Sequence, residues 1–204
     1  MWLLLIGWIF RFETQTAPPA ELKANAIKAV ELDPSDHRTR RAAAFGYFFD
    51  HQLQMFDNEA TLATTMAPND AQVLAEMGTM LTMSGQWDRG VKLVTKANAL
   101  NAGSAHGWYH TALFYDYFRQ GQYQRAVDII QFHQAQNLVE TQQKYVAVYA
   151  ELGNIDKARE HWNKCVKLDP KWSIERMQEI LILWNFPKDF AQRYLQSFAK
   201  AGYR

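Results

Sequence analysis

The feature that most constrains the fold of this chain is a repeat with a period of 34 residues. Three segments end in similar triplets, Leu32-Asp33-Pro34, Met66-Ala67-Pro68 and Leu168-Asp169-Pro170. The first two prolines are 34 positions apart, and the first and third are 136 apart, which is four periods. The two intermediate marks fall at Ala102, in a related Leu-Asn-Ala-Gly segment, and at Gln136, in a polar break. A unit of this length buries its apolar face only by stacking on its neighbours, so the period predicts an array of stacked units.

Thirty-four residues is the length of the tetratricopeptide repeat, a pair of antiparallel helices, and the chain resembles this family at further positions. Residues 69–102 fit its pattern of large and small side chains at Leu74, Gly78, Leu81, Gly90, Val94 and Ala97. Residues 103–136 fit at Trp108, Ala112 and Tyr115 and, displaced by two positions, at Gly121, Tyr123 and Ala126. Residues 137–170 fit at Tyr145, Tyr149, Gly153, Ile155, Ala158, Trp162 and Cys165. Residues 35–68 form a degenerate unit, because the glycine between its two helices is absent.

The glycines of this pattern stand where the backbone requires a residue without a side chain. Gly85, Gly121 and Gly153 are predicted to end first helices, where a residue in the left-handed conformation is needed. Gly90 costs its helix about 1 kcal/mol relative to alanine, which is tolerable where a neighbouring helix crosses closely.

The resemblance implies an all-α fold, a right-handed α-α superhelix in the form of a TPR-like solenoid of about five helix pairs plus a C-terminal capping pair. We expect a single domain, with a degenerate N-terminal pair at 1–34, four units at 35–170 and capping helices at 171–204. The expected helices lie near 2–14, 19–32, 36–50, 53–66, 70–84, 87–100, 104–119, 123–136, 139–152, 155–168, 172–184 and 187–201.

The apolar run at residues 2–10 is too short to span a bilayer, which takes about 20 residues. No basic residue precedes the run, so a buried helix is favoured over a signal peptide, a short anchor or an interfacial segment. A start inside an apolar helix suggests a fragment of a longer protein. The segments 99–101, 107–109, 121–123 and 199–203 resemble the repeat tails of bacterial regulators that follow an adenylate cyclase or winged-helix domain. That resemblance implies a bacterial, cytoplasmic, regulatory setting and transfers no catalytic residues.

Composition and motifs argue against several classes of function. The formal net charge of +1 disfavours a nucleic-acid binder. Cys165 is the only cysteine, so a multi-cysteine zinc site is excluded, and its repeat position predicts a buried thiol. The sequence holds no glycine-rich phosphate loop, no Gly-x-Ser-x-Gly and no His-Glu-x-x-His. We therefore expect no enzyme activity, no catalytic residues and no cofactor.

A small-molecule or metal sensor is the first alternative. His106 and His110 are four residues apart, with His133 on the paired helix, and His106, Tyr109 and Asp116 form a candidate cluster. We expect these histidines to be structural and predict no metal site. A second alternative is a structural module for homodimerisation.

The preferred prediction is a scaffold that binds a protein or peptide in a concave groove lined by first helices. The groove would be basic and aromatic at one end and acidic at the other. Its predicted residues are Arg38, Arg41, Phe45, Phe48, Phe49, Thr79, Met83, His106, Tyr109, Leu113, Asp116, Tyr117, Glu140 and Gln143. The competing interpretation is that the aromatic residues pack against each other or against the helix expected at 2–14. No membrane span and no nucleic-acid partner are expected.

Overall fold

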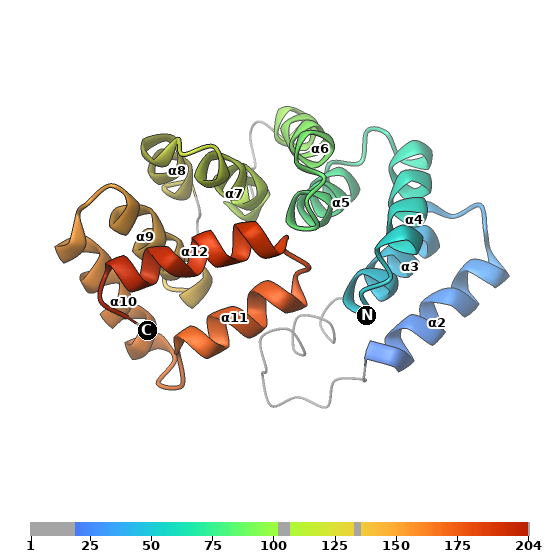
Figure 1. Ribbon diagram of the computed structural model, residues 1–204. Helices are drawn as coiled ribbons and strands as arrows, with labels where there is room; N and C mark the ends of the chain where they lie inside the picture. The colour runs from blue at the N-terminus through green and yellow to red at the C-terminus, as the bar shows by residue number, and fades with distance from the viewer. Residues whose placement is uncertain (1–18, 102–106, 133–135, 204) are drawn as a thin grey trace. The chain divides into compact units, whose positions relative to one another are not determined.

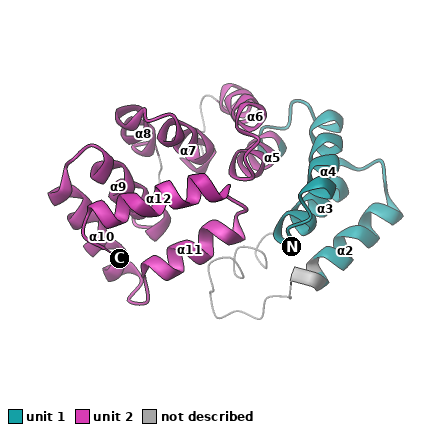
Figure 2. Ribbon diagram, viewed as in Figure 1, with its two compact units in different colours: residues 1–73 teal, residues 74–204 magenta. Residues whose placement is uncertain are grey.

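The structure is a computed structural model that describes residues 19–101, 107–132 and 136–203 (Figure 1). Within these ranges every regular element is a helix, so the predicted all-α fold is confirmed. The chain divides into two compact units, residues 1–73 and residues 74–204, which are described separately below (Figure 2). The helix predicted near 2–14 lies outside the described residues. The single-domain organisation stays a prediction.

Unit 1 contains α2 (Pro19–Leu32), α3 (His37–Phe49), α4 (Leu53–Met66) and the first residues of α5 (Ala71–Met83). The helix α3 packs between α2 and α4. Asp36 is the N-cap of α3, and its carboxylate accepts a hydrogen bond from the backbone N–H of Arg38 at 2.8 Å. Asp70 caps α5 in the same way, because its carboxylate accepts from the N–H groups of Gln72 and Val73. The predicted helix starts after Pro34 and Pro68 are confirmed.

Unit 2 contains the rest of α5 and eight further elements. They are α6 (Trp87–Leu100), η1 (Gly107–His110), α7 (Thr111–Arg119), α8 (Tyr123–Ile130), α9 (Val139–Glu151), α10 (Ile155–Leu168), α11 (Ile174–Leu183) and α12 (Lys188–Lys200). Along the chain, α7 pairs with α8 and α9 pairs with α10. The tetratricopeptide-like helix pairs predicted from the period are therefore present.

One predicted helix is too long. The prediction near 123–136 overshoots α8, which ends at Ile130 and gives way to a turn at Gln131 and Phe132. The buried face of α8 consists of Ala126, Val127 and Ile130. The next positions on that face are His133 and Gln134, so the sequence offers no apolar side chain that would be buried by continuing the helix.

The first helix of every described pair ends in the same hydrogen-bonded turn. Gly85, Gly121 and Gly153 have φ angles of 89°, 73° and 75°, which confirms the left-handed conformation predicted for them. In each turn the next N–H donates to the carbonyl five residues earlier, as Gln86 does to Leu81 at 2.8 Å. This pattern is the Schellman motif, which satisfies carbonyls at a helix end.

Two of these turns use residues other than glycine. His51 and Asn185 each have a φ of 58°, and the N–H groups of Gln52 and Phe186 close the same turn. The unit at 35–68 therefore has the same turn geometry as the others, although the sequence pattern marks it as degenerate. The final pair, α11 and α12, has it too.

The helices α5 and α6 cross at two glycines. A Cβ atom placed on Gly90 would lie 2.5 Å from the carbonyl oxygen of Gly78, and one on Gly78 would lie 2.8 Å from the carbonyl oxygen of Gly90. Neither separation is compatible with a side chain, so only glycine allows this approach. The close crossing proposed as the reason for Gly90 is confirmed.

We predict that Gly153→Ala lowers the free energy of unfolding by about 1–2 kcal/mol, because an L-residue in the left-handed region costs about that much. No heavy atom lies within 4 Å of a Cβ placed on Gly153, so the substitution tests backbone conformation alone. Urea unfolding followed by circular dichroism measures the effect. Gly153→Asn is the matched control and should lose less, since asparagine tolerates this conformation. Equal stability of the glycine and alanine chains would contradict the assignment.

Candidate partner-binding faces

The helix α12 runs back over unit 2 and packs on α9 (Figure 1). It carries an aromatic residue at every fourth position from the turn before it onward: Phe186, Phe190, Tyr194 and Phe198. Successive ring centroids are 5.1, 5.7 and 5.7 Å apart. Residues four apart share one face of a helix, so these side chains form a continuous stripe, here called the aromatic ladder.

The aromatic ladder packs against aromatic residues of three other helices. On α7, Tyr115 lies 4.8 Å from Phe186 and Phe118 lies 4.9 Å from Tyr194, both in edge-to-face geometry. On α6, Trp87 lies 5.2 Å from Phe190, and on α10, Trp162 lies 6.1 Å from Phe198. An aromatic pair in such geometry contributes about 0.5–1.5 kcal/mol beyond the area that it buries. The ladder thus joins α6, α7 and α10 to α12.

The contact between α12 and α9 is polar. The Tyr194 hydroxyl donates to Gln143 Oε1 at 2.6 Å. The Ser197 hydroxyl donates to Glu151 Oε1 at 2.8 Å, and Lys200 Nζ donates to Glu151 Oε2 at 2.7 Å. In all three bonds α12 supplies the donor and α9 the acceptor. We call the surface formed by Tyr115, Phe118, Gln143 and Glu151 the docking face, and α12 covers it.

The surroundings of the Glu151 side chain bury it and favour its charged form. Its side chain is only 8% exposed. Burial raises the pKa of Glu151, the hydrogen bonds from Lys200 and Ser197 lower it, and the net shift is downward. The carboxylate is thus charged beneath α12, which supplies two of its donors, Ser197 and Lys200, beside the hydroxyl of Tyr123 on α8.

Beneath the docking face, α9 buries a lysine. Lys144 is 2% exposed, and its ammonium donates to Thr111 Oγ1 at 3.2 Å. The ammonium lies 5.7 and 5.5 Å from the ring centroids of Phe114 and Tyr115, which is within the range of a cation–π contact. Burial lowers the pKa of Lys144 to about 7, against the opposing charge of Glu140, whose own pKa burial raises.

The predicted groove residues of unit 1 lie on α3. Arg38 is exposed, Arg41 and Phe45 are half-buried, and Phe48 and Phe49 are buried. Phe45 and Phe49 stack at 6.4 Å, and Phe48 meets Phe56 of α4 at 5.0 Å. Phe48 and Phe49 thus belong to the interior of the described structure, as the competing interpretation held.

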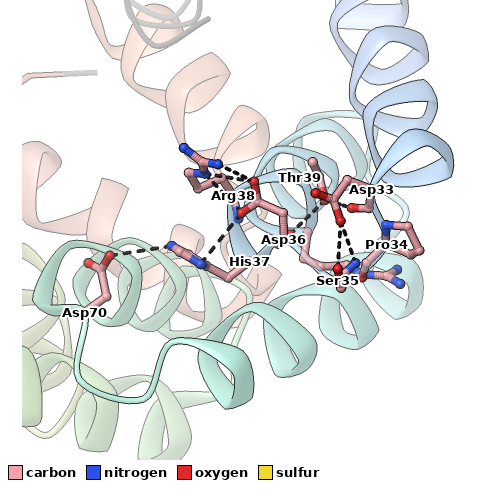
Figure 3. Close-up of polar contacts among 9 residues, drawn as sticks. Asp33, Pro34, Ser35, Asp36, His37, Arg38, Thr39 and Asp70 are labelled. Carbon is pink, nitrogen blue, oxygen red and sulfur yellow. Dashed lines mark hydrogen bonds and ion pairs between the residues drawn. The ribbon is translucent and has the colours of Figure 1, made fainter.

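Figure 3 shows that the basic end of the predicted groove is linked to acidic neighbours. Arg38 donates from Nε and Nη2 to the carboxylate of Asp36, with the Nη2 contact at 2.7 Å. Hydrogen bonds from Arg38, together with its charge, lower the pKa of Asp36 to about 2. His37 lies between Asp36 and Asp70, with 3.8 Å from a ring nitrogen to each carboxylate. Arg40 contacts Glu59 of α4 at 3.2 Å.

The predicted groove residues of unit 2 are mostly covered. Thr79, Met83, Tyr109, Asp116 and Gln143 are buried, and Leu113, Tyr117 and Glu140 are half-buried. Gln143 belongs to the docking face and is bonded to α12. Asp116 accepts from Arg119 at 2.7 Å and from Gln120 at 2.6 Å, and Arg125 covers the ring of Tyr117 at 4.6 Å. In this arrangement a partner reaches Gln143 only after α12 has moved.

The described part of the structure adds no candidate ligands to the metal-site hypothesis. His106 and His133 lie outside the described residues, and within the described ranges no three His, Cys, Asp or Glu side chains are grouped to hold a metal ion. The ring of His110 instead lies 5.5 Å from Phe132. Cys165 is buried as predicted, and burial raises the pKa of its thiol to about 12.

The residues of the aromatic ladder were not identified from the sequence as part of a candidate site. The signal was present, because aromatic residues recur at every fourth position from Phe186 to Phe198. That period indicates that the aromatic residues share one face of a helix. Because the repeat pattern is lost in this part of the sequence, the sequence does not indicate which surface that face packs against.

Several solved structures share the fold. The crystal structure of PilW, a widely conserved type IV pilus biogenesis factor, matches with a TM-score of 0.66 and 15% identity over 94% of this chain and 87% of that chain. MamA matches with a TM-score of 0.53 and 21% identity over 78% of this chain and 91% of that chain. MamA from Desulfovibrio magneticus RS-1 matches with a TM-score of 0.51 and 19% identity over 91% of this chain and 94% of that chain. At these identities the likeness shows the fold alone, a tetratricopeptide-like helical array.

No protein-family model matches the chain, and no curated protein matches its sequence. The further resemblance to tails of cyclase and winged-helix regulators is not shown by these neighbours. Among the helices that the structure describes, none combines the length and the apolar character needed to cross a bilayer.

We predict that the stability of the chain rises between pH 7 and pH 8.5 because of Lys144. Its pKa is about 7 in the fold and 10.5 ordinarily, so the unfolded chain holds more protons in this window. Stability then increases by up to about 1.4 kcal/mol per pH unit. Lys144→Met should be more stable than the parent at pH 7 and should lose this rise.

Urea unfolding at pH 7.0 and pH 8.5 tests the prediction, with Lys164→Met as the matched control on an exposed stretch of α10. The control should keep the slope of the parent chain. The range ends below pH 9 because Cys165, whose pKa is raised in the fold, acts in the opposite direction above it. A Lys144→Met chain with the parent's slope would contradict the assignment.

Proposed function

We propose that the chain is a non-catalytic scaffold that binds segments of other proteins on the faces of its first helices. The observation that carries the proposal is the docking face, which already holds a helix through aromatic contacts and three directed hydrogen bonds. A surface that holds one helix in this way has the features of helix-in-groove recognition, in which apolar anchors supply binding energy and polar groups set the register. The shared fold with PilW and MamA is consistent with this role.

In unit 1 the corresponding surface lies on α3. Arg38, Arg41 and Phe45 are spaced by three and four residues, so they lie along one side of the helix. The side chain of Arg38 is 75% exposed, and Asp36 occupies donors on its Nε and Nη2. A guanidinium has five donors, so Nη1 can still bind a carboxylate of a partner. We infer that this side of α3 binds a segment with an acidic residue followed by an apolar one.

The other predicted groove residues extend this proposal along the first helices of unit 2. Leu113 and Tyr117 are half-buried on α7, and Glu140 is half-buried on α9. The wider setting, a regulatory module of a bacterial cytoplasmic protein, rests on sequence resemblance alone. Homodimerisation stays a prediction.

The experiment selects displayed random peptides on the purified full chain and measures the enriched peptides by fluorescence anisotropy. We expect enriched peptides to carry Asp or Glu near an apolar residue. Arg38→Gln with Arg41→Gln should weaken their binding at least tenfold, which corresponds to about 1.4 kcal/mol. The matched control, Lys164→Gln with Lys167→Gln on α10, removes the same charge from a second helix and should bind as the parent does.

Circular dichroism confirms that each variant is folded. Binding that is equally strong in the arginine variant and the control would contradict the α3 assignment. A failure to enrich any peptide at all would contradict the proposed function.

A further inference from the structure

We propose that the docking face accepts a helix of a second protein in place of α12, and that this helix carries aromatic residues at every fourth position followed by hydroxyl or ammonium donors. α12 is then the resident, displaceable occupant of a binding site. This inference deepens the proposed function, since it assigns a partner chemistry to unit 2, and it does not depend on the face of α3.

The chemistry of the docking face prescribes the chemistry of its occupant. Gln143 presents its amide oxygen and Glu151 both carboxylate oxygens toward α12. These acceptors are covered, because Gln143 is 3% exposed and the Glu151 side chain 8%. Leaving a buried acceptor without its donor is unfavourable, and more so when the acceptor is charged. An occupant without donors at these places would leave the Gln143 oxygen without its donor and would leave Glu151 with the Tyr123 hydroxyl but without the two donors of α12, so the face discriminates against purely apolar helices.

The aromatic half of the docking face adds spacing to this requirement. Tyr115 and Phe118 on α7 each contact two or more rings of the ladder, and Tyr194 lies within 5.8 Å of the first and 4.9 Å of the second. Rings of the occupant must therefore follow one another at intervals of one helical turn. Phe190, Tyr194, Ser197 and Lys200 of α12 meet both requirements, and they define the pattern expected in a partner helix.

The helices α7, α8, α9 and α10 of unit 2 pair with each other without α12. α7 packs directly on α8, α8 on α9, and α9 on α10. α12 connects to α11 through a short turn in which Asn185 holds a left-handed φ of 58°. The contacts among α7, α8, α9 and α10 do not involve α12, so an equivalent helix that replaces α12 has to restore only the contacts that α12 makes.

The covalent connection of α12 to α11 gives α12 an advantage over any separate partner in binding the docking face. A segment joined by a short linker acts at an effective concentration of the order of millimolar. A partner helix must therefore bind the docking face more tightly than α12 does, or bind when contacts of α12 are weakened. Loss of the donors Ser197 and Lys200 should weaken α12 while leaving the aromatic ladder and the docking face unchanged.

The test uses the full chain and a fluorescent synthetic peptide with the sequence of residues 186–203. We expect the Ser197→Ala/Lys200→Ala chain to bind this peptide at least tenfold more tightly than the parent chain does, measured by anisotropy. The control chain Gln192→Ala/Gln196→Ala alters the exposed side of α12 and should bind as weakly as the parent. A peptide with Tyr194→Ala should lose at least tenfold in affinity for the weakened chain.

The proposal is overturned if the weakened chain is folded and binds no peptide, or binds the Tyr194→Ala peptide equally well. If that chain does not fold, hydrogen exchange of the parent chain decides. Amides of α12 that exchange ahead of those of α7 and α9 support displacement, and amides that exchange together with them overturn it. Failure of the α3 variants to affect peptide selection leaves this result untouched, so the two proposals fail separately.

Discussion

The packing of α12 on the rest of unit 2 depends on the burial of Tyr194 between α7 and α9. Its ring is fully buried and lies 4.9 Å from Phe118, while its hydroxyl donates to Gln143 at 2.6 Å. Burial raises the pKa of this hydroxyl well above its ordinary value, so it stays a neutral donor. One side chain thus satisfies both parts of the docking face, the aromatic part on α7 and the acceptors on α9. The rest of the aromatic ladder is aligned with it by the helical spacing of four residues.

Most of the fold could be predicted because its controlling signals are local. The period of 34 residues placed the helices within a few positions, and Gly85, Gly121 and Gly153 marked turns that require a left-handed residue. His51 and Asn185 escaped notice because they adopt the same conformation without being glycine. A turn is set by hydrogen bonds that several residue types can complete, so the absence of glycine did not mean the absence of the turn.

The candidate site could be predicted only in part because it depends on contacts distant in sequence. Position within the repeat correctly placed Gln143 on a first helix, but the residue that meets it, Tyr194, lies in the segment that has lost the repeat pattern. The sequence predicted an acidic end of a groove on the helix that carries Glu140, and the structure pairs another carboxylate of that helix, Glu151, with Lys200. The net charge of +1 likewise conceals local pairing, since Arg38 is bonded to Asp36 and Arg40 to Glu59. Charge patterns along a sequence do not say which charges are already neutralised within the fold.

The central claim is that α12 lies on α9 in the full chain, and carbodiimide cross-linking with peptide mass spectrometry tests it most directly. The reagent joins an ammonium to a carboxylate in contact, and Lys200 Nζ lies 2.7 Å from Glu151 Oε2. We predict an intramolecular Lys200–Glu151 link in the monomer band. The neighbouring pair Lys164–Glu160, at 2.6 Å within α10, is the internal control. A Lys164–Glu160 link without any Lys200–Glu151 link would contradict the account.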